Sequence, residues 1–410
     1  MAGSAAPDRI AALDLVRGVA VLGILAINAA SFAGGANGPL SPALSAPAGT
    51  ADELVYLINF VLFEGKMRGL FTVLFGASLL LFMERRESGA SDGPRWQMRR
   101  LGWLFVIGYA HQLFLWSGDI LMLYAMLAPL ALAARHWSAR RLAVVAVAAF
   151  ALWHGGFTLA GKPTFVAIEA ERAGTAEAKA IAELTSLRAA ISADARAELA
   201  VLRQPYPAMV AARFGETLYM PFLIALFSLG ETVPLMLLGM ALYRSGFFAG
   251  GWIRADLWRL ALGGLAVGLP LAMALAWWIE SRGFPAEAML FVFLGAAGPS
   301  HLALTLAYAA LLVLAAPALL RTAIGTRLQA AGQMALSNYL LTSLLMTFVF
   351  HGWGLGLAGT VGTLAQWGWV LGVWLVLLAW SGPWLRRYRQ GPVEWLWRGL
   401  TYRHWQPLTR

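Results

Sequence analysis

The sequence contains no cysteine among its 410 residues. A disulfide framework and a cysteine-ligated metal or haem are therefore excluded. Charged residues are also scarce, at 13%, whereas hydrophobic residues make up 60% and the mean hydropathy is +0.66. A soluble globular domain of this length does not have such a composition. We therefore interpret the chain as an integral membrane protein.

Other expected patterns are missing as well. The alternation of apolar and polar residues that predicts membrane strands does not occur, so we expect helices. The start of the chain has neither the basic region nor the small-residue cleavage site of a signal peptide, and we interpret it as an uncleaved first helix. No internal repeat is visible, which weighs mildly against transporters that are built from repeats.

What the sequence does contain is a series of hydrophobic runs, each long enough to cross a hydrocarbon core of roughly 30 Å as a helix. We predict an all-α polytopic membrane protein that forms a single transmembrane domain over 1–410. About ten transmembrane helices are expected, at 10–32, 60–84, 98–116, 119–134, 142–160, 217–244, 256–279, 289–318, 332–351 and 362–385.

Two segments lie outside these spans. At 161–215 strong helix formers carry nearly balanced charges, which predicts a helical extracytoplasmic insertion that either covers a site or connects helices. At 386–410 tryptophan, tyrosine and arginine alternate, which predicts an interfacial tail on the cytoplasmic side.

The net charge of +10 comes from arginines that cluster in alternate loops. This is the positive-inside pattern, and it predicts that both termini lie in the cytoplasm. Topology and anionic lipid headgroups account for nearly all the excess charge, so we expect membrane lipids and no nucleic acid as partners.

Polar residues interrupt the first apolar run, "LDLVRGVAVLGILAIN". Asp14 and Arg17 are three residues apart and can neutralise each other on one helical face. Asn28 follows Arg17 by about three turns and lies on nearly the same face. Charges near a bilayer centre cost roughly 2.5 to 3.5 kcal/mol each and often mark a functional site. A snorkelling pair at the helix end is the simpler alternative.

Further polar residues occur in later spans. Lys66 and Arg68 are expected near the outer interface, where they either snorkel or contribute to a site. His111 can exchange a proton near neutral pH, and Asp119 follows a tight turn, where it either orients His111 or caps the next helix. Three more candidates for substrate binding lie deeper along the chain: Glu231, His301 and Asn338. No metal-binding motif occurs, so we expect no metal and no bound cofactor.

Several stretches together resemble the YeiB-like bacterial membrane proteins, a family of unknown function. They are "RIAALDLVRGVAVLGILAINAASF", "KMRGLFTVLFG", "RRLGWLFVIGYAHQLFLWSGDILMLYA", "MALSNYLLTSLLMTFVFHGWGLGL" and "GPVEWLWRGLTY". That family is grouped with the transmembrane acyltransferases, which include the acyltransferase-3 proteins and heparan-α-glucosaminide acetyltransferase. The resemblance implies a bacterial inner-membrane location and transfer of an acyl group from a cytoplasmic donor, with acyl-CoA as co-substrate.

The resemblance departs at one position. Acyltransferase-3 proteins have an essential histidine eleven residues after an arginine of the first helix. Here Arg17 matches that arginine, but Asn28 occupies the histidine position. We therefore predict His111 as the general base, Asp119 as its orienting group, and Asn28 with Lys66 as polar stabilisers of the developing charge.

Three functions stay open at this point. A transmembrane acyltransferase would act on a small-molecule or lipid-linked acceptor at the membrane or the outer face. A carrier or channel for a lipid-linked or anionic small molecule would use the same charged residues to line a path. A non-catalytic scaffold or sensor would need them only for stability, and an oligomer is compatible with all three.

Overall fold

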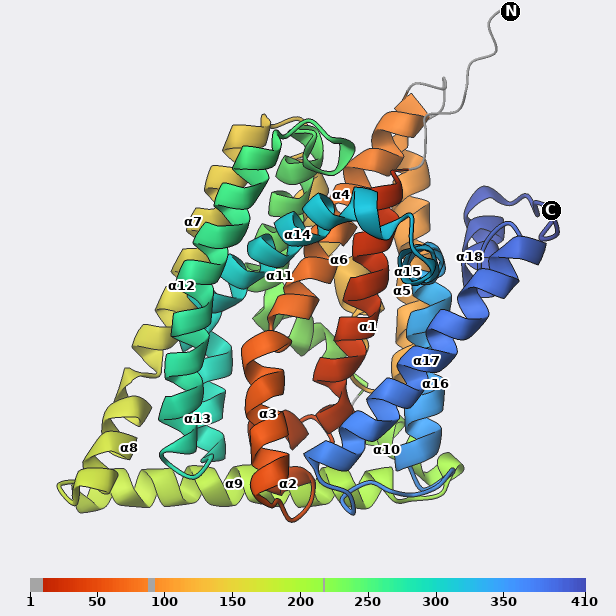
Figure 1. Ribbon diagram of the computed structural model, residues 1–410. Helices are drawn as coiled ribbons and strands as arrows, with labels where there is room; N and C mark the ends of the chain where they lie inside the picture. The colour runs from red at the N-terminus through yellow and green to blue at the C-terminus, as the bar shows by residue number, and fades with distance from the viewer. Residues whose placement is uncertain (1–9, 88–92, 217) are drawn as a thin grey trace, which may run out of the picture.

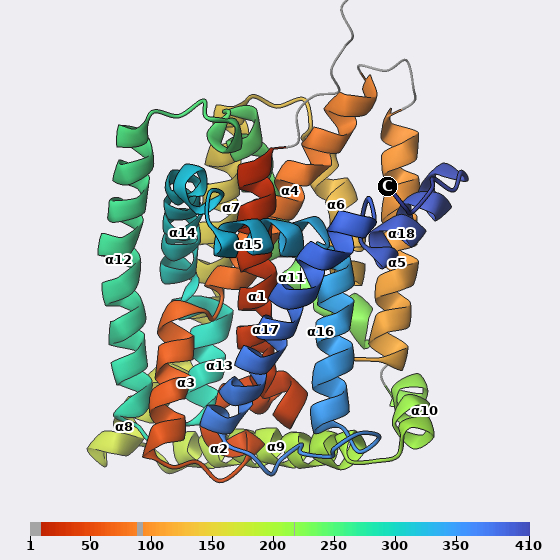
Figure 2. The same ribbon diagram turned by 45° about the vertical axis from the view of Figure 1, so that its right-hand side comes forward.

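The computed structural model describes residues 10–87, 93–216 and 218–410. Every regular element within these residues is a helix, as predicted, and strand pairing there is limited to one bridge between Tyr388 and Thr409. Long helices pack side by side, and α9 (Ala178–Leu202) lies across one end of the bundle (Figure 1 and Figure 2). We call this end the α9 end. The opposite end, where α1 (Ala11–Gly34) begins and α18 (Pro392–Tyr402) lies, is the α18 end.

The bundle is that of a multi-pass membrane protein. Within the described ranges, seven helical segments are long and apolar enough to cross a membrane: α1, the α3–α4 segment Thr50–Glu84, α7 (Ala139–Ala160), α11 (Met220–Arg244), α12 (Arg254–Glu280), α14 (Gly298–Leu319) and α17 (Thr363–Arg387). An eighth results if α15 (Ala323–Gln333) and α16 (Ala335–Phe350), which are bent by 89° relative to each other, form one broken span.

The expected count of ten is therefore not confirmed, because two of the predicted spans are not among these helices. The predicted span 98–116 corresponds to α5 (Gly93–Phe114), whose first turns contain several arginines. The predicted span 119–134 corresponds to α6 (Leu121–Ala133), which has only 13 residues. At a rise of about 1.5 Å per residue, α6 is too short to cross a bilayer by itself.

Three other predicted spans are interrupted. In place of one helix over 60–84, α3 (Thr50–Leu62) and α4 (Lys66–Glu87) meet at Gly65, whose φ of 74° favours glycine. The predicted span 289–318 is divided into α13 (Ala286–Phe291), the π-helical turn η3 (Val292–Ala296) and α14. The predicted span 332–351 begins within the α15–α16 bend.

Short elements and the insertion complete the fold. The short ones are η1 (Gly38–Leu40), α2 (Pro42–Ser45) and η2 (Phe247–Ala249). The insertion at 161–215 is helical as expected, and its helices α8 (Lys162–Ala173), α9 and α10 (Tyr206–Glu216) form what we call the belt.

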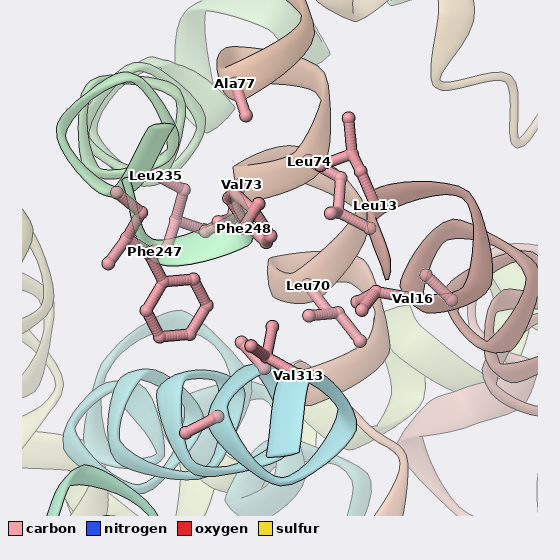
Figure 3. Close-up of a cluster of buried hydrophobic side chains, with 14 of the residues drawn as sticks. Leu13, Val16, Leu70, Val73, Leu74, Ala77, Leu235, Phe247, Phe248 and Val313 are labelled. Atoms are coloured by element: carbon pink, nitrogen blue, oxygen red, sulfur yellow. The ribbon is translucent and has the colours of Figure 1, made fainter. Parts of the chain in front are cut away.

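The core of the bundle gathers around α4. In Figure 3, Leu70 and Leu74 of α4 face Val16 of α1, and the cluster extends to Leu235 of α11 and Val313 of α14. These side chains are all at least nine-tenths buried, so α4 is held on several sides at once. Its polar residues are thereby placed at fixed positions inside the membrane domain.

The crossing of α1 and α15 is unusually close. A Cβ atom added to Gly18 would overlap the backbone carbonyl of Leu328, and one added to Gly332 would overlap that of Asp14. Two glycines therefore let the backbones touch, as small residues do at helix contacts in membranes. The contact fixes α15 against the first turns of α1.

Candidate functional site

A cavity of about 390 Å³ lies at the α18 end of the bundle, between α1, α4, α5, α6, α16 and α18. We call it the α18-end cavity. Its wall contains five charged side chains from three helices, which are Asp14, Arg17, Arg100, Glu394 and Arg398. Aromatic side chains line it as well, among them Phe71, Phe75, Tyr124 and Tyr339.

The polarity of the cavity changes with depth. Arg398 is exposed and Arg100 is half-buried, whereas Tyr124 and Tyr339 are only 1% and 3% exposed. The exposed part of the wall therefore contains arginines, whereas the buried part contains aromatic rings together with the Asp14 carboxylate, which is 4% exposed and paired with Arg17. A pocket with this gradient suits a ligand that has an anionic group at one end and an apolar group at the other.

Arg17 and Asp14 form the ion pair that their spacing predicts. Arg17 Nη1 donates to Asp14 Oδ1 at 2.9 Å, and Nη2 donates to the hydroxyl of Ser78 at 2.9 Å. The carboxylate and the hydroxyl hold the guanidinium at the cavity wall, where it can also bind a ligand.

Arg100 is a cavity residue that sequence reasoning missed. Its guanidinium lies between two aromatic rings, 4.7 Å from the centroid of Phe82 and 4.4 Å from that of Trp397. Such cation–π contacts orient an arginine without neutralising it. In the sequence Arg100 belongs to a basic cluster that topology explains, so no local signal separates it from its neighbours.

Glu394 attaches α18 to the cavity. Its Oε1 accepts the backbone N–H groups of Leu336 and Ser337 at 2.8 and 3.1 Å, and the Ser337 hydroxyl donates to Oε2. Burial raises the pKa of the Glu394 carboxyl, and the hydrogen bonds from Ser337 oppose that shift. The carboxylate thus caps the first turn of α16 from a helix almost sixty residues away in the sequence.

His111 and Asp119 lie together, as predicted. His111 Nδ1 is 3.4 Å from Asp119 Oδ1, and the two side chains are 1% and 0% exposed. Neither nitrogen of His111 has a hydrogen-bond partner within the described residues. The Asp119 carboxylate also accepts the backbone N–H of Leu121 at 2.8 and 3.0 Å. The carboxylate therefore caps the start of α6 and also faces the histidine, while its role in orienting His111 stays a prediction.

Tyr339 joins this pair to the cavity. Its ring lines the cavity and lies 5.2 Å from the ring of His111. Its hydroxyl accepts the backbone N–H of Ile120, the residue after Asp119, at 3.2 Å. His111 does not itself line the cavity, so Tyr339 stands between the ligand space and the imidazole.

A second group of predicted residues lies elsewhere, around the break at Gly65. Lys66 is 0% exposed and donates to the carbonyl oxygen of Phe60 at 2.7 Å. Arg68 donates to both oxygens of Glu231 at 3.0 and 3.1 Å. The ring of His301 packs directly against Gly65, and neither of its nitrogens has a hydrogen-bond partner within the described residues.

These positions revise two expectations. Lys66 and Arg68 are not at the end of a span, because α3 continues the segment beyond the break and places both inside Thr50–Glu84. The hypothesis that Lys66 and Asn28 stabilise charge beside His111 has no support from the contacts of the described residues. The Lys66 ammonium is bound by Phe60, and neither Lys66 nor Asn28 lines the α18-end cavity.

Asn338 has a packing role. Its amide nitrogen donates to the carbonyl oxygen of Ala331 and to the hydroxyl of Ser381, both at 3.0 Å. The indole N–H of Trp380 donates to its amide oxygen at 2.9 Å. Asn338 therefore joins α16 to α15 and α17, and it does not line the α18-end cavity.

Comparison with known proteins places the chain among related sequences. It is 30% identical over 404 residues to the uncharacterized protein YeiB of Escherichia coli (strain K12), and the match covers 97% of each chain. The chain belongs to the YeiB family. The uncharacterized protein YxaH of Bacillus subtilis (strain 168) is 29% identical over 413 residues, which is 98% of this chain and 96% of that protein.

The other comparisons agree with this assignment to the YeiB family. Residues 242–404 match the family described as a protein of unknown function (DUF418). An uncharacterized 39.9 kDa protein of Bacillus acidopullulyticus is 31% identical over 118 residues, 29% of this chain and 32% of that protein. No solved structure matches the chain.

Proposed function

We propose that this chain is a transmembrane acyltransferase with an acyl-CoA-type donor. One observation carries the proposal: Tyr339 belongs to the wall of the α18-end cavity and is also adjacent to His111. A donor in this cavity would have its inner end near His111 and Asp119, a pair of side chains that can move a proton.

The character of the cavity supports such a donor. Arginine binds phosphate groups through charge-assisted, often bidentate hydrogen bonds, and both Arg17 and Arg100 line the wall. The aromatic inner part, with Phe71 and Phe75, suits an acyl chain. The volume also falls within the range of about 300 to 1,000 Å³ that is common for small-molecule sites.

We place the α18 end in the cytoplasm and the protein in a bacterial inner membrane. Arginines flank the helix ends there, at the start of α5, the start of α7 and the end of α17. Cytoplasmic flanks carry such an excess of arginine and lysine. This orientation opens the cavity toward the compartment that supplies acyl-CoA.

In the proposed reaction, His111 takes the proton from the hydroxyl or amine of the acceptor as that group attacks the thioester carbon. The carbon–sulfur bond breaks while the new ester or amide bond forms, and the proton passes from His111 to the leaving thiolate, giving free CoA. Asp119 orients the imidazole. The ring of Tyr339 turns aside to admit the acceptor, a small or lipid-linked molecule at the membrane or the outer face.

The test is release of free CoA by the purified full-length protein, supplied with acetyl-CoA and, separately, palmitoyl-CoA, with water as the hydroxyl that accepts the acyl group. A thiol reagent detects the product without background, because the chain has no cysteine. We expect His111→Gln to lower the rate by at least about a hundredfold, the usual contribution of a positioned base. Arg17→Ala should weaken acyl-CoA binding in a thermal-shift titration.

His136→Gln is the matched control, because His136 is exposed and does not line the cavity. It should leave the rate unchanged. Equal rates for wild type and His111→Gln would overturn the assignment of the base. No binding and no release with either acyl-CoA would overturn the proposed donor.

A carrier for an anionic or lipid-linked small molecule is the second candidate, and one observation favours it. Lys66, Arg68, Glu231 and His301 lie inside the membrane domain but outside the wall of the α18-end cavity. Ionisable residues at such depth often line substrate or ion paths. A carrier would give counterflow in proteoliposomes without any covalent change in the solute, and Glu231→Gln would slow that counterflow.

A further inference from the structure

A second hollow at the α18 end lies between α15 and α17, and it shares one lining residue, Gln333, with the cavity described above. Its volume is about 520 Å³, and we call it the α15–α17 groove. The residues that line it are Ala323, Thr326, Arg327, Gln329, Ala330 and Gln333 from α15, Ala379, Gly382, Pro383, Leu385 and Arg386 from α17, and Arg410. No acidic side chain is among them.

The charge of the groove is unbalanced. Arg327, Arg386 and Arg410 are all exposed, and none of them forms an ion pair with the described residues. Arg410 is held near α17 because its backbone N–H donates to the carbonyl oxygen of Arg387 at 3.3 Å. Three guanidiniums therefore border one hollow without internal neutralisation, which creates a site for an anion.

The groove continues into an apolar surface. Ala379, Gly382 and Arg386 repeat at helical spacing along α17, and the preceding turns of the same face contain Leu375 and Leu371. These two leucines are 70% and 51% exposed. Because α17 is long and apolar enough to cross a membrane, this face lies among lipid chains.

Two glycines leave unfilled space on this side of α17. A Cβ atom at Gly372 or at Gly382 would meet no atom within 4 Å, so each leaves open space beside α17. The bend of 89° between α15 and α16 turns α15 across the bundle (Figure 2), and side chains of α15 line one side of the groove. The result is an arginine-lined hollow next to an apolar strip of α17. We call this strip, which contains Leu371 and Leu375, the furrow.

We propose that the α15–α17 groove binds the phosphate group of an anionic phospholipid, with an acyl chain lying along α17. Basic pockets between membrane helices recognise anionic headgroups in this way. A free phosphate ion would satisfy the arginines as well, but it would leave the exposed furrow of Leu371 and Leu375 unexplained. The occupant is therefore a lipid, and the site is independent of the proposed acyltransferase activity.

The test uses the purified full-length protein in detergent, titrated with dioctanoyl phosphatidylglycerol, dioctanoyl phosphatidylcholine or inorganic phosphate. The shift in unfolding temperature reports binding. Phosphatidylglycerol should stabilise the wild type, and the double variant R327Q/R386Q should need an about tenfold higher concentration for the same shift. Phosphatidylcholine and inorganic phosphate should have much smaller effects.

The matched control is R140Q/R254Q, which removes two exposed arginines that lie outside the groove. This variant should respond to phosphatidylglycerol within about twofold of wild type. An equal loss in both double variants would mean diffuse attraction and would overturn the proposal. Equal stabilisation by inorganic phosphate would also overturn it, because the ligand would then be a soluble anion.

A second variant tests the proposal independently, in case the double arginine variant does not fold. G382L keeps every arginine and places its side chain in open space. It should weaken phosphatidylglycerol binding by blocking the furrow while the unfolding temperature without lipid stays near that of wild type. Unchanged phosphatidylglycerol binding in G382L would show that no chain occupies the furrow and would contradict the proposal.

Discussion

The carboxylate of Asp119 and the imidazole of His111 meet in the interior of the membrane domain, with Asp119 Oδ1 3.4 Å from His111 Nδ1. The same carboxylate accepts the backbone N–H of Leu121 at 2.8 Å and so begins α6. The backbone holds the carboxylate in place, and the carboxylate in turn faces the histidine. The Asp119 side chain therefore both begins α6 and faces the proposed base.

Asp119→Asn separates these two roles. Asparagine is as good a helix cap as aspartate, so the unfolding temperature should change little. It has no negative charge to hold the His111 imidazolium, so CoA release should fall about ten- to a hundredfold, as for other groups that orient a reactive histidine. The thiol assay and a thermal unfolding curve on the same sample measure both quantities.

Asp119→Ala is the companion variant. It removes the cap as well, which should lower the free energy of unfolding by about 1 kcal/mol. Full CoA release by Asp119→Asn would limit Asp119 to the capping role, and the proposed pair with His111 would be wrong.

Arg100→Gln tests the cationic part of the α18-end cavity. The Arg100 guanidinium is held between the rings of Phe82 and Trp397 and is not engaged by any acidic side chain of the described residues. Loss of a charge-assisted contact to a phosphate should raise the KM for acyl-CoA about tenfold while kcat stays near wild type. Arg140→Gln, which changes the charge equally outside the cavity, should leave KM unchanged; equal effects would indicate only long-range attraction.

Much of this architecture follows from local sequence. Composition predicts the helical membrane domain, and the spacing of Asp14 and Arg17 predicts their ion pair. The turn before Asp119 also predicts that its helix returns beside His111, because two helices joined by a short turn are neighbours. In both pairs the interacting groups are close in the chain, so the period of a helix or a short turn is enough to place them.

The α18-end cavity could not be predicted in that way. Glu394 reaches the start of α16 from nearly sixty residues away, and Trp397 stacks on Arg100 from almost three hundred away. The bend between α15 and α16 also has no local signal in the apolar pattern. These features depend on long-range packing, which one sequence does not reveal.

Gly18→Ala tests the close crossing of α1 and α15. The added methyl group would overlap the carbonyl of Leu328, a backbone atom that cannot move away by rotation. Overpacking of this kind should lower the free energy of unfolding by about 1 to 3 kcal/mol. Gly102→Ala on α5 is the control, because its methyl group meets no atom within 4 Å. A stable Gly18→Ala protein would show that the two helices can separate without cost.

Arg188→Gln tests the attachment of the belt. Arg188 of α9 donates to Glu171 of α8 and to Glu287 of α13, each at 2.6 Å, and the side chain of Glu287 is only 1% exposed. Without the arginine a buried carboxylate loses its partner, which should cost about 3 kcal/mol. Lys179→Gln on the exposed face of α9 should cost less than about 0.5 kcal/mol. Protease cleavage within 161–215 measures the loosening, and equal cleavage of both variants would contradict this role.

Glu169 makes the attachment of the belt depend on pH. Hydrogen bonds from the Arg282 guanidinium, at 2.6 and 2.7 Å, and from the Trp278 indole hold the pKa of Glu169 below its usual value. Since the pKa is lower in the folded protein than in the unfolded chain, the interaction stabilises fully above the unfolded value of about 4.3. It is lost as the pH falls through the folded pKa.

Glu169→Gln should therefore be less stable than wild type at pH 7 and no less stable well below pH 4. The carboxylate is 35% exposed, so solvent screening limits the difference at pH 7 to about 1 kcal/mol. Unfolding curves recorded from pH 7 to pH 3 should converge as the carboxylate of the wild type becomes protonated. Curves that stay parallel over this range would mean that ionisation of the carboxylate contributes nothing to the attachment.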